Sequence, residues 1–186
     1  MSVRALARRL AALALLTVLP GCGYALVGHG MVVDPDIKKI GVPQFRNLTT
    51  KAGLEQKITQ AVIEELQKRG RFEVVSEAAG VNALVDGELT AYPAPRPVGF
   101  SEAAGAAVGS TAAAQATRYE VSITAKVRYT KVGQVDPIWS NDAFSFREEY
   151  DMGSDPSTFL DREGQALDRL VEAFARSLVS TMLEAF

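Results

Sequence analysis

The residues of this chain that could take part in acid, base or metal chemistry are few. The single histidine, His29, has no second histidine or cysteine to complete a metal site, so we interpret it as a loop residue. Two pairs of carboxylates, Asp34 with Asp36 and Asp86 with Glu88, could act as general acid and base. Alternation along a strand would put each pair on one solvated face, which explains both pairs without catalysis. We therefore expect no catalytic residue, no metal site and no cofactor, and an anchored hydrolase is the least favoured interpretation.

The only cysteine, Cys22, follows a segment that is typical of an export signal. Arg4, Arg8 and Arg9 give a positive start, and residues 10–19 form an uncharged apolar run. This run is shorter than the roughly 20 apolar residues that a stable membrane-spanning helix needs. We predict that residues 1–21 are a signal peptide that is removed.

The sequence Leu19-Pro20-Gly21-Cys22 resembles a bacterial lipobox, although proline is a less usual occupant of its position. Cleavage before Cys22 would leave a thiol to carry a diacylglycerol and an α-amine to carry a further acyl chain such as palmitate. One chain anchors a protein only reversibly, whereas three would hold it firmly. Since Gly23 and not aspartate follows the cysteine, we expect a lipoprotein of the outer membrane that faces the periplasm. An unmodified thiol after an ordinary cleavage site is the alternative.

Composition limits the remaining classes of function. Of the 20 basic residues three lie in the signal segment, so the processed chain carries 17 basic against 22 acidic residues and a net charge of −5. Such a chain lacks the basic excess of a general nucleic-acid binder. We expect an anchor and linker at 22–36 and a single domain at 37–186.

Hydrophobic periodicity predicts two helices. From Gly53 an apolar stripe runs with helical spacing to Lys68, Arg69 and Gly70, where basic residues and a glycine favour termination. A second, longer helix is predicted from Pro156 onward, and its stripe comprises Leu160, Leu167, Leu170, Val171, Phe174, Leu178, Val179, Met182 and Leu183.

Strand signals fill the rest of the domain. Residues 37–45, 72–76 and 83–92 have an extended pattern, and residues 118–132 alternate cleanly between apolar and polar. A turn at 133–137 should join this long strand to a strand over 138–150 as a hairpin. The sequence thus predicts an α+β sandwich, with a mostly antiparallel sheet of four to five strands and both helices on one face. The other face is open, either to a partner or simply to water.

One segment does not fit this plan. Residues 103–117 hold eight alanines and no charge, and the proline-rich residues 93–97 precede them. The segment is too long for an ordinary hairpin turn and too small-sided for a membrane helix. It is either a disordered surface loop or a loop that becomes ordered inside a partner.

The order of these features resembles the LPS-assembly lipoproteins of the LptE family over nearly the whole processed chain. The residues that carry the resemblance are Cys22-Gly23-Tyr24 with Gly28, Ile40-Gly41-Val42-Pro43 with Phe45 and Asn47, Leu54 with Lys68-Arg69-Gly70, Val85-Asp86-Gly87, the strand from Tyr119, and Glu148-Glu149-Tyr150.

The resemblance implies a non-enzymatic protein that plugs the lumen of a large outer-membrane β-barrel, LptD, and helps lipopolysaccharide (LPS) to reach the outer leaflet. A lipid-transport accessory lipoprotein that contacts an inner-membrane transporter is the alternative. The central loop would contact the barrel, with Ala103, Ala107 and Ala113 as candidate positions.

The resemblance also implies that LPS itself is bound through basic side chains near the central loop and the last helix. This chain departs from the family there, so its candidates are the nearest basic residues. LPS is anionic and a net charge of −5 would repel it unless basic groups gather locally. The nearest basic residues are Arg118 and Arg162, and Lys126 and Arg128 share the wet face of the long strand with Arg118, which makes such a gathering possible although Glu120 dilutes it.

Overall fold

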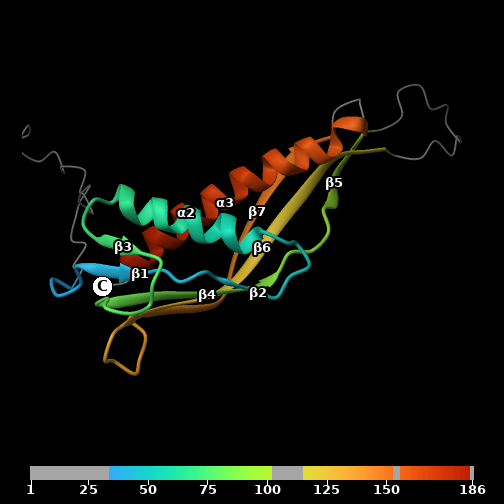
Figure 1. The fold of residues 1–186 in the computed structure, drawn as a ribbon. Helices are drawn as coiled ribbons and strands as arrows, with labels where there is room; N and C mark the ends of the chain where they lie inside the picture. The colour runs from blue at the N-terminus through green and yellow to red at the C-terminus, as the bar shows by residue number, and fades with distance from the viewer. Residues whose placement is uncertain (1–33, 102–114, 153–155, 185–186) are drawn as a thin grey trace, which may run out of the picture. The chain divides into compact units, whose positions relative to one another are not determined.

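The computed structural model describes residues 34–101, 115–152 and 156–184, all within one compact unit that spans Met31–Phe186 (Figure 1). The predictions for the signal segment, for Cys22, for His29 and for the alanine-rich loop with Ala103, Ala107 and Ala113 lie outside these residues.

The first predicted helix is confirmed as α2 (Leu54–Lys68). Gly53 precedes it in a left-handed conformation with φ 77°, and Gly70 follows it with φ 65°, a region that favours glycine. The apolar stripe faces inward, because Leu54, Ile58, Val62 and Leu66 are all buried. The residues that the sequence marked as the beginning and end of this helix therefore have those roles.

The second helix, α3, comprises Phe159–Glu184 and follows a short 3-10 turn, η1 (Pro156–Thr158). Its predicted stripe is buried from Leu167 to Leu183, but Leu160 is 75% exposed, so that residue was wrongly assigned to the core. Leu160 lies in the first turn of the helix, where its neighbour Phe159 packs against the ring of Tyr119 instead.

Seven strands form the sheet: β1 (Lys39–Gly41), β2 (Arg46–Asn47), β3 (Glu73–Val75), β4 (Ala83–Ala91), β5 (Arg96–Ser101), β6 (Gln115–Lys131) and β7 (Trp139–Asp151). β6 lies between β7 on one side and both β4 and β5 on the other, and β4 in turn pairs with β1 and β2. β3 pairs with β1 at the edge of the sheet.

The predicted α+β class is confirmed, and the sheet is mixed. The pairs β4–β6, β5–β6 and β6–β7 are antiparallel, whereas the short strands β1, β2 and β3 pair in parallel. Two strands were missed by the sequence analysis. β2 has only two residues and gives no strand pattern, and β5 was obscured because Pro97 lies inside it.

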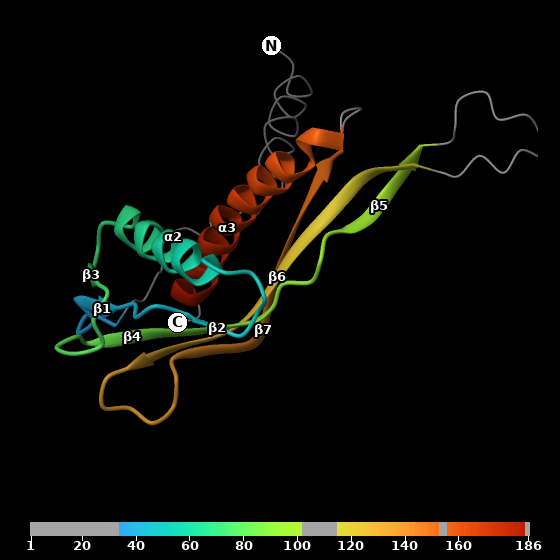
Figure 2. The ribbon, with the colours of Figure 1, turned by 45° about the vertical axis from the view of Figure 1, so that its right-hand side comes forward.

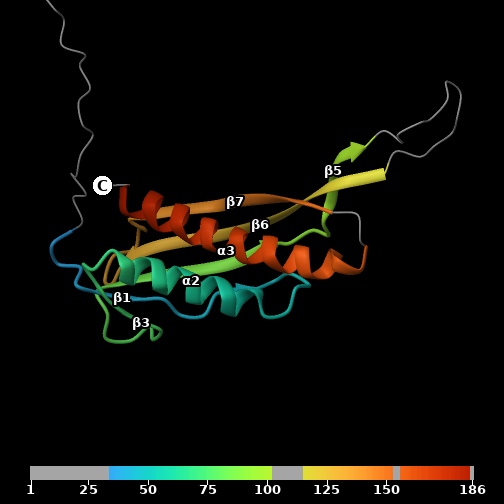
Figure 3. The ribbon, with the colours of Figure 1, turned by 90° about the horizontal axis from the view of Figure 1, so that it is seen from above.

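Both helices cover the same face of the sheet, as the view from above shows (Figure 3). The predicted alternation of β6 is confirmed, since Val121, Ile123, Ala125, Val127 and Tyr129 have no exposed surface. Trp139, Phe144 and Phe146 of β7 pack against the same core from partly buried positions. The opposite face of the sheet carries no helix among the described residues.

Gly87 lets the chain before α2 approach the core face of β4. A Cβ atom at this position would lie 2.2 Å from the ring of Phe45, which is buried against it. The Val-Asp-Gly sequence that contributed to the family resemblance thus has a packing reason.

The described domain has two distinct ends. β5 and the first part of β6 run beyond the first turn of α3 toward the central loop (Figure 2). The far end of β6 meets the start of β4 and the turn that leads into β7.

Asp34 and Asp36 were expected on a strand, and this is wrong. They lie in a turn before β1, where both carboxylates pair with Lys131 of β6. The hydrogen bond from Lys131 holds the pKa of Asp34 below its ordinary value.

Candidate partner-binding surface

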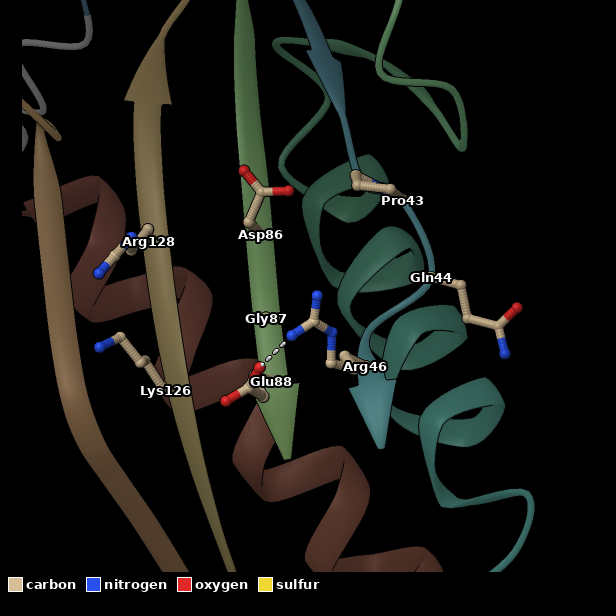
Figure 4. Close-up of a pocket in the computed structure, with 8 residues that line it drawn as sticks. All are labelled: Pro43, Gln44, Arg46, Asp86, Gly87, Glu88, Lys126 and Arg128. Carbon is tan, nitrogen blue, oxygen red and sulfur yellow. Dashed lines mark hydrogen bonds and ion pairs between the residues drawn. The ribbon is translucent and has the colours of Figure 1, made fainter. Parts of the chain in front are cut away.

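The open face of the sheet is covered by cross-strand ion pairs. On the row through β2, β4 and β6, Arg46 pairs with Glu88 at 3.0 Å, and Glu88 lies opposite Lys126 in the register. Lys126 points away from Glu88 (Figure 4) and pairs instead with Asp142 of β7 at 2.7 Å. An irregularity in β7 between Asn141 and Phe144 places Asp142 there, because two residues of β7 lie opposite the single residue Lys126 of β6.

Arg128 lies on the next row, opposite Asp86 of β4 and Ser140 of β7. It points in the same direction as Lys126 (Figure 4). Arg128 forms no hydrogen bond or ion pair with any residue that the structure describes. The pKa of Asp142 is held below its ordinary value, first by the hydrogen bond from Lys126 and further by the charges of Lys126 and Arg128.

These side chains line an open pocket of about 400 Å³, formed by Pro43, Gln44, Arg46, Asp86, Gly87, Glu88, Lys126 and Arg128 (Figure 4). Its cations outnumber its carboxylates by one. The predicted candidates Lys126 and Arg128 are therefore brought together in one depression of the open face.

The other two candidates, Arg118 and Arg162, meet at a separate pocket of about 380 Å³ near the end of β7. Arg118 pairs with Asp151 at 2.9 Å and with Glu149 at 3.6 Å. The hydrogen bond to Asp151 is the main cause of the raised pKa of Arg118. Arg162 donates a hydrogen bond to the backbone oxygen of Asp151 at 3.1 Å. The four candidates thus form two pairs and not one site.

Three further arginines belong to these surfaces and were missed by sequence reasoning. Arg169 of α3 lines the second pocket and pairs with Glu148 at 2.8 Å. Arg96 and Arg147 both approach the buried carboxylate of Glu120, at 2.7 and 4.0 Å. The alternation of β7 could have identified Arg147, whereas Arg96 lies on the unrecognised strand β5.

The charges of the open face balance. Its described basic residues are Lys39, Arg46, Arg96, Arg118, Lys126, Arg128 and Arg147, and its described acidic residues are Glu73, Asp86, Glu88, Glu120, Asp142, Glu149 and Asp151. Each exposed pair contributes about 0 to 1 kcal/mol to stability, so these pairs can exchange partners at low cost. The face is a polar surface without a net charge that would attract an anion over a distance.

A different polar cluster connects α3 to the loop before α2 and to the residue that follows β4. The largely buried carboxylate of Glu163 accepts hydrogen bonds from Lys51 and from the hydroxyl of Tyr92, each at 3.2 Å. Burial and the charge of Glu163 raise the pKa of Tyr92, so its hydroxyl stays protonated and donates. This cluster is internal and satisfied, which indicates a structural role.

The described residues include no group of three or more histidine, cysteine, aspartate or glutamate side chains that could hold a metal ion. Within the same residues, neither α2 nor α3 combines the length and the apolarity needed to cross a bilayer.

One protein-family model matches most of this chain. The family model LptE, described as lipopolysaccharide-assembly, matches residues 37–182. Among curated protein sequences none matches significantly.

Several solved structures are similar at low identity. Protein XCC0632 from Xanthomonas campestris gives a TM-score of 0.51 at 10% identity, over 81% of this chain and 87% of that chain. Lipoprotein B from Nitrosomonas europaea gives 0.48 at 13% identity, over 80% and 81%. A minor lipoprotein from Acinetobacter baumannii gives 0.47 at 10% identity, over 79% and 93%. The first of these shows a shared fold and nothing further.

Proposed function

The chain belongs to the LptE lipopolysaccharide-assembly family, and from this premise we propose that it is an outer-membrane lipoprotein that plugs an LptD-type β-barrel and assists LPS transport. The match over residues 37–182 carries the proposal, because it covers the whole described domain except its ends. The role is non-enzymatic: the protein supports assembly of the barrel and helps LPS to reach the outer leaflet.

The surface of the domain supports a position inside a barrel lumen. The lumen of a large outer-membrane barrel is polar, in contrast to its lipid-facing exterior. The open face of this sheet is polar and balanced in charge, and the outer sides of the helices carry exposed polar residues such as Gln60, Glu64, Asp168 and Glu172. A domain with such a surface can contact acidic or basic side chains of the barrel lumen without burying an unpaired charge.

LPS would be bound where a phosphate can replace a carboxylate as the partner of a basic group. In the pocket of Figure 4, Arg128 forms no ion pair with a described residue and Lys126 is held only by the exposed Asp142. Arg118 and Arg162 are the second candidate pair, although Asp151 and Glu149 already hold Arg118. We rank the pocket that contains Arg128 first for this reason.

The test of LPS binding is the charge reversal Arg128→Glu, with Arg176→Glu on the exposed side of α3 as the matched control. After mild detergent extraction, the Arg128 variant should retain several-fold less LPS, while the control should retain the wild-type amount. Both should keep the wild-type melting temperature. If both variants retain the same amount of LPS, Arg128 does not take part in LPS binding.

Anchoring is tested by Cys22→Ala. The variant should accumulate as an uncleaved or soluble protein, because no thiol remains to receive the diacylglycerol. Intact mass and membrane fractionation measure this outcome. A variant that is still acylated and still sorted to the outer membrane would end the lipoprotein proposal.

Barrel contact is tested with photo-crosslinkers at Ala107 or Ala113, with Glu64 on the exposed side of α2 as the control position. The uncharged loop should crosslink to a large outer-membrane protein, since small side chains permit close approach to a barrel wall. Crosslinks from Glu64 alone would place the contact elsewhere. Co-purification with an inner-membrane transporter and no barrel would favour the accessory-lipoprotein alternative.

A further inference from the structure

The end of the domain where the described chain begins is built from three segments that lie together in Figures 1 and 3. They are residues 34–38, the turn 76–82 that leads into β4, and the turn 132–138 between β6 and β7. We call this end the base. It is opposite the β5 end along β6.

Asn82 ties the three segments of the base to one another. Its side-chain oxygen accepts hydrogen bonds from the backbone of Lys38 and Lys39, at 3.2 and 2.9 Å. Its backbone oxygen accepts a hydrogen bond from Val132 at 2.8 Å. The salt bridges from Lys131 to Asp34 and Asp36 add a second connection. The base is therefore a fixed surface.

The β6–β7 turn presents apolar side chains at this surface. Val135 is 97% exposed, the most exposed large apolar side chain among the described residues, and Val132 is 53% exposed. The turn is held in shape by a hydrogen bond from Gln134 to the carbonyl of Lys131 at 3.0 Å and by Gly133 at φ 90°. Val135 is thus displayed to solvent by an ordered turn, with no described residue covering it.

The length of the chain that precedes the base limits its distance from a lipid anchor. Residues 22–33 are twelve residues, which span at most about 40 Å when fully extended. The seventeen residues of β6 are about 55 Å long. A lipid on Cys22 therefore keeps the base within reach of the leaflet that holds the anchor, while it does not constrain the β5 end in this way.

The composition of the tether favours a still shorter distance. Residues 23–33 include no lysine, arginine, aspartate or glutamate, and five of them are leucine, valine or methionine. Such a segment is not repelled by a lipid surface and gains by lying on it.

We infer that the β6–β7 turn rests on the phospholipid surface that holds the anchor, with Val135 in the headgroup region. The inference rests on the proposed lipidation of Cys22, and it is compatible with the proposed barrel contact because that contact is proposed for the β5 end, at the other end of β6. The contact is shallow, because Asp136 follows directly and its carboxylate has to stay hydrated. Lys38 is exposed at the base without an ion pair to another described residue, and it can approach lipid phosphates.

The single cysteine of the chain makes the test direct. In the processed protein Cys22 carries the lipid, so Val135→Cys introduces the only free thiol. The full lipidated protein, labelled there with a nitroxide and reconstituted into phosphatidylethanolamine–phosphatidylcholine vesicles, is measured for collision with oxygen and with a water-soluble nickel chelate. The ratio of oxygen to nickel accessibility should be several-fold higher at position 135 than at two exposed controls, Leu48→Cys and Phe100→Cys.

Equal ratios at the three positions would overturn the inference. Flotation with the vesicles and the intact mass of the protein separate this result from failure of the anchor. A protein that floats while its label at 135 is aqueous contradicts only the turn contact. A protein that neither floats nor carries lipid contradicts the proposed lipidation and the inference together.

Discussion

Successive residues of β6 point to opposite faces of the sheet, and the side chains on these two faces make different kinds of contact. On the helix side Val121, Ile123 and Val127 are completely buried against α3 and its neighbours. On the open side Ser122, Lys126 and Arg128 keep contact with water and lie among ion pairs. Full burial of a large apolar side chain contributes about 1.5 to 3 kcal/mol, whereas an exposed ion pair contributes about 0 to 1 kcal/mol.

This difference teaches where the chain can change without losing its fold. The helix side fixes the structure, so substitutions there act on stability. The open side contributes little to stability, so its side chains are available to a partner. The comparison fails if substitutions on the two sides have similar effects on unfolding.

The largest effect is expected from Phe174→Ala on the helix side. Phe174 has no exposed surface and contacts the ring of Phe144 edge-on at 5.2 Å. Its truncation leaves a cavity and should lower the free energy of unfolding by about 3 to 5 kcal/mol. Denaturant titration measures this change. Leu160→Ala, in the same helix but 75% exposed, is the control and should change it by less than about 0.5 kcal/mol.

A smaller loss is expected from Gly87→Ala, which tests how closely the core face of β4 is packed. The added methyl group would meet the ring of Phe45, and the displacement should cost about 1 to 3 kcal/mol of unfolding free energy. Gly164→Ala in α3 is the opposite case, because nothing lies within 4 Å of the added carbon. That variant should gain about 0.5 to 1 kcal/mol from the helix propensity of alanine. Destabilisation of both variants alike would show that packing at Gly87 is not the cause.

The smallest effect is expected from Asp142→Asn on the open side. The substitution removes the ion pair with Lys126. The side chain of Asp142 is 76% exposed, so the melting temperature at neutral pH should fall only slightly. Lys126 lowers the pKa of Asp142 in the folded protein below its ordinary value, so the pair stabilises the fold above the pKa that Asp142 has in the unfolded chain. This contribution disappears as the pH falls through the lowered pKa of the folded protein. Melting temperatures of both proteins from pH 7 to pH 3 should therefore converge. A difference that widens on acidification would contradict the assignment.

Local pattern was enough to predict most elements. The stripe of α2, its glycines and the alternation of β6 each depend on residues close in sequence, and all three are confirmed. β5 was missed because Pro97 is disfavoured in strands, and only pairing with β6 makes residues 96–101 extended. Leu160 followed the helical spacing but lies in the first turn of α3, where the sheet does not cover it.

The candidate site was predicted only in part. Lys126 and Arg128 share a face because alternate residues of a strand always do, and this holds in any tertiary context. That Arg162 lies beside Arg118 depends on how α3 crosses the end of β7. The partner of each basic group depends on strand register, as Arg96 with Glu120 shows.

The sequence alone determined that this domain has two amphipathic helices and a long strand with one wet face, because hydrophobic periodicity is a property of near neighbours. It also contains the lipobox-like sequence Leu19-Pro20-Gly21-Cys22, a pattern of four adjacent residues that does not depend on the fold. Only the tertiary structure decided that the wet face is balanced in charge and that Val135 shares the base with the start of the described chain. These facts depend on side chains brought together from distant strands, whose register is fixed by burial of the other face of the sheet.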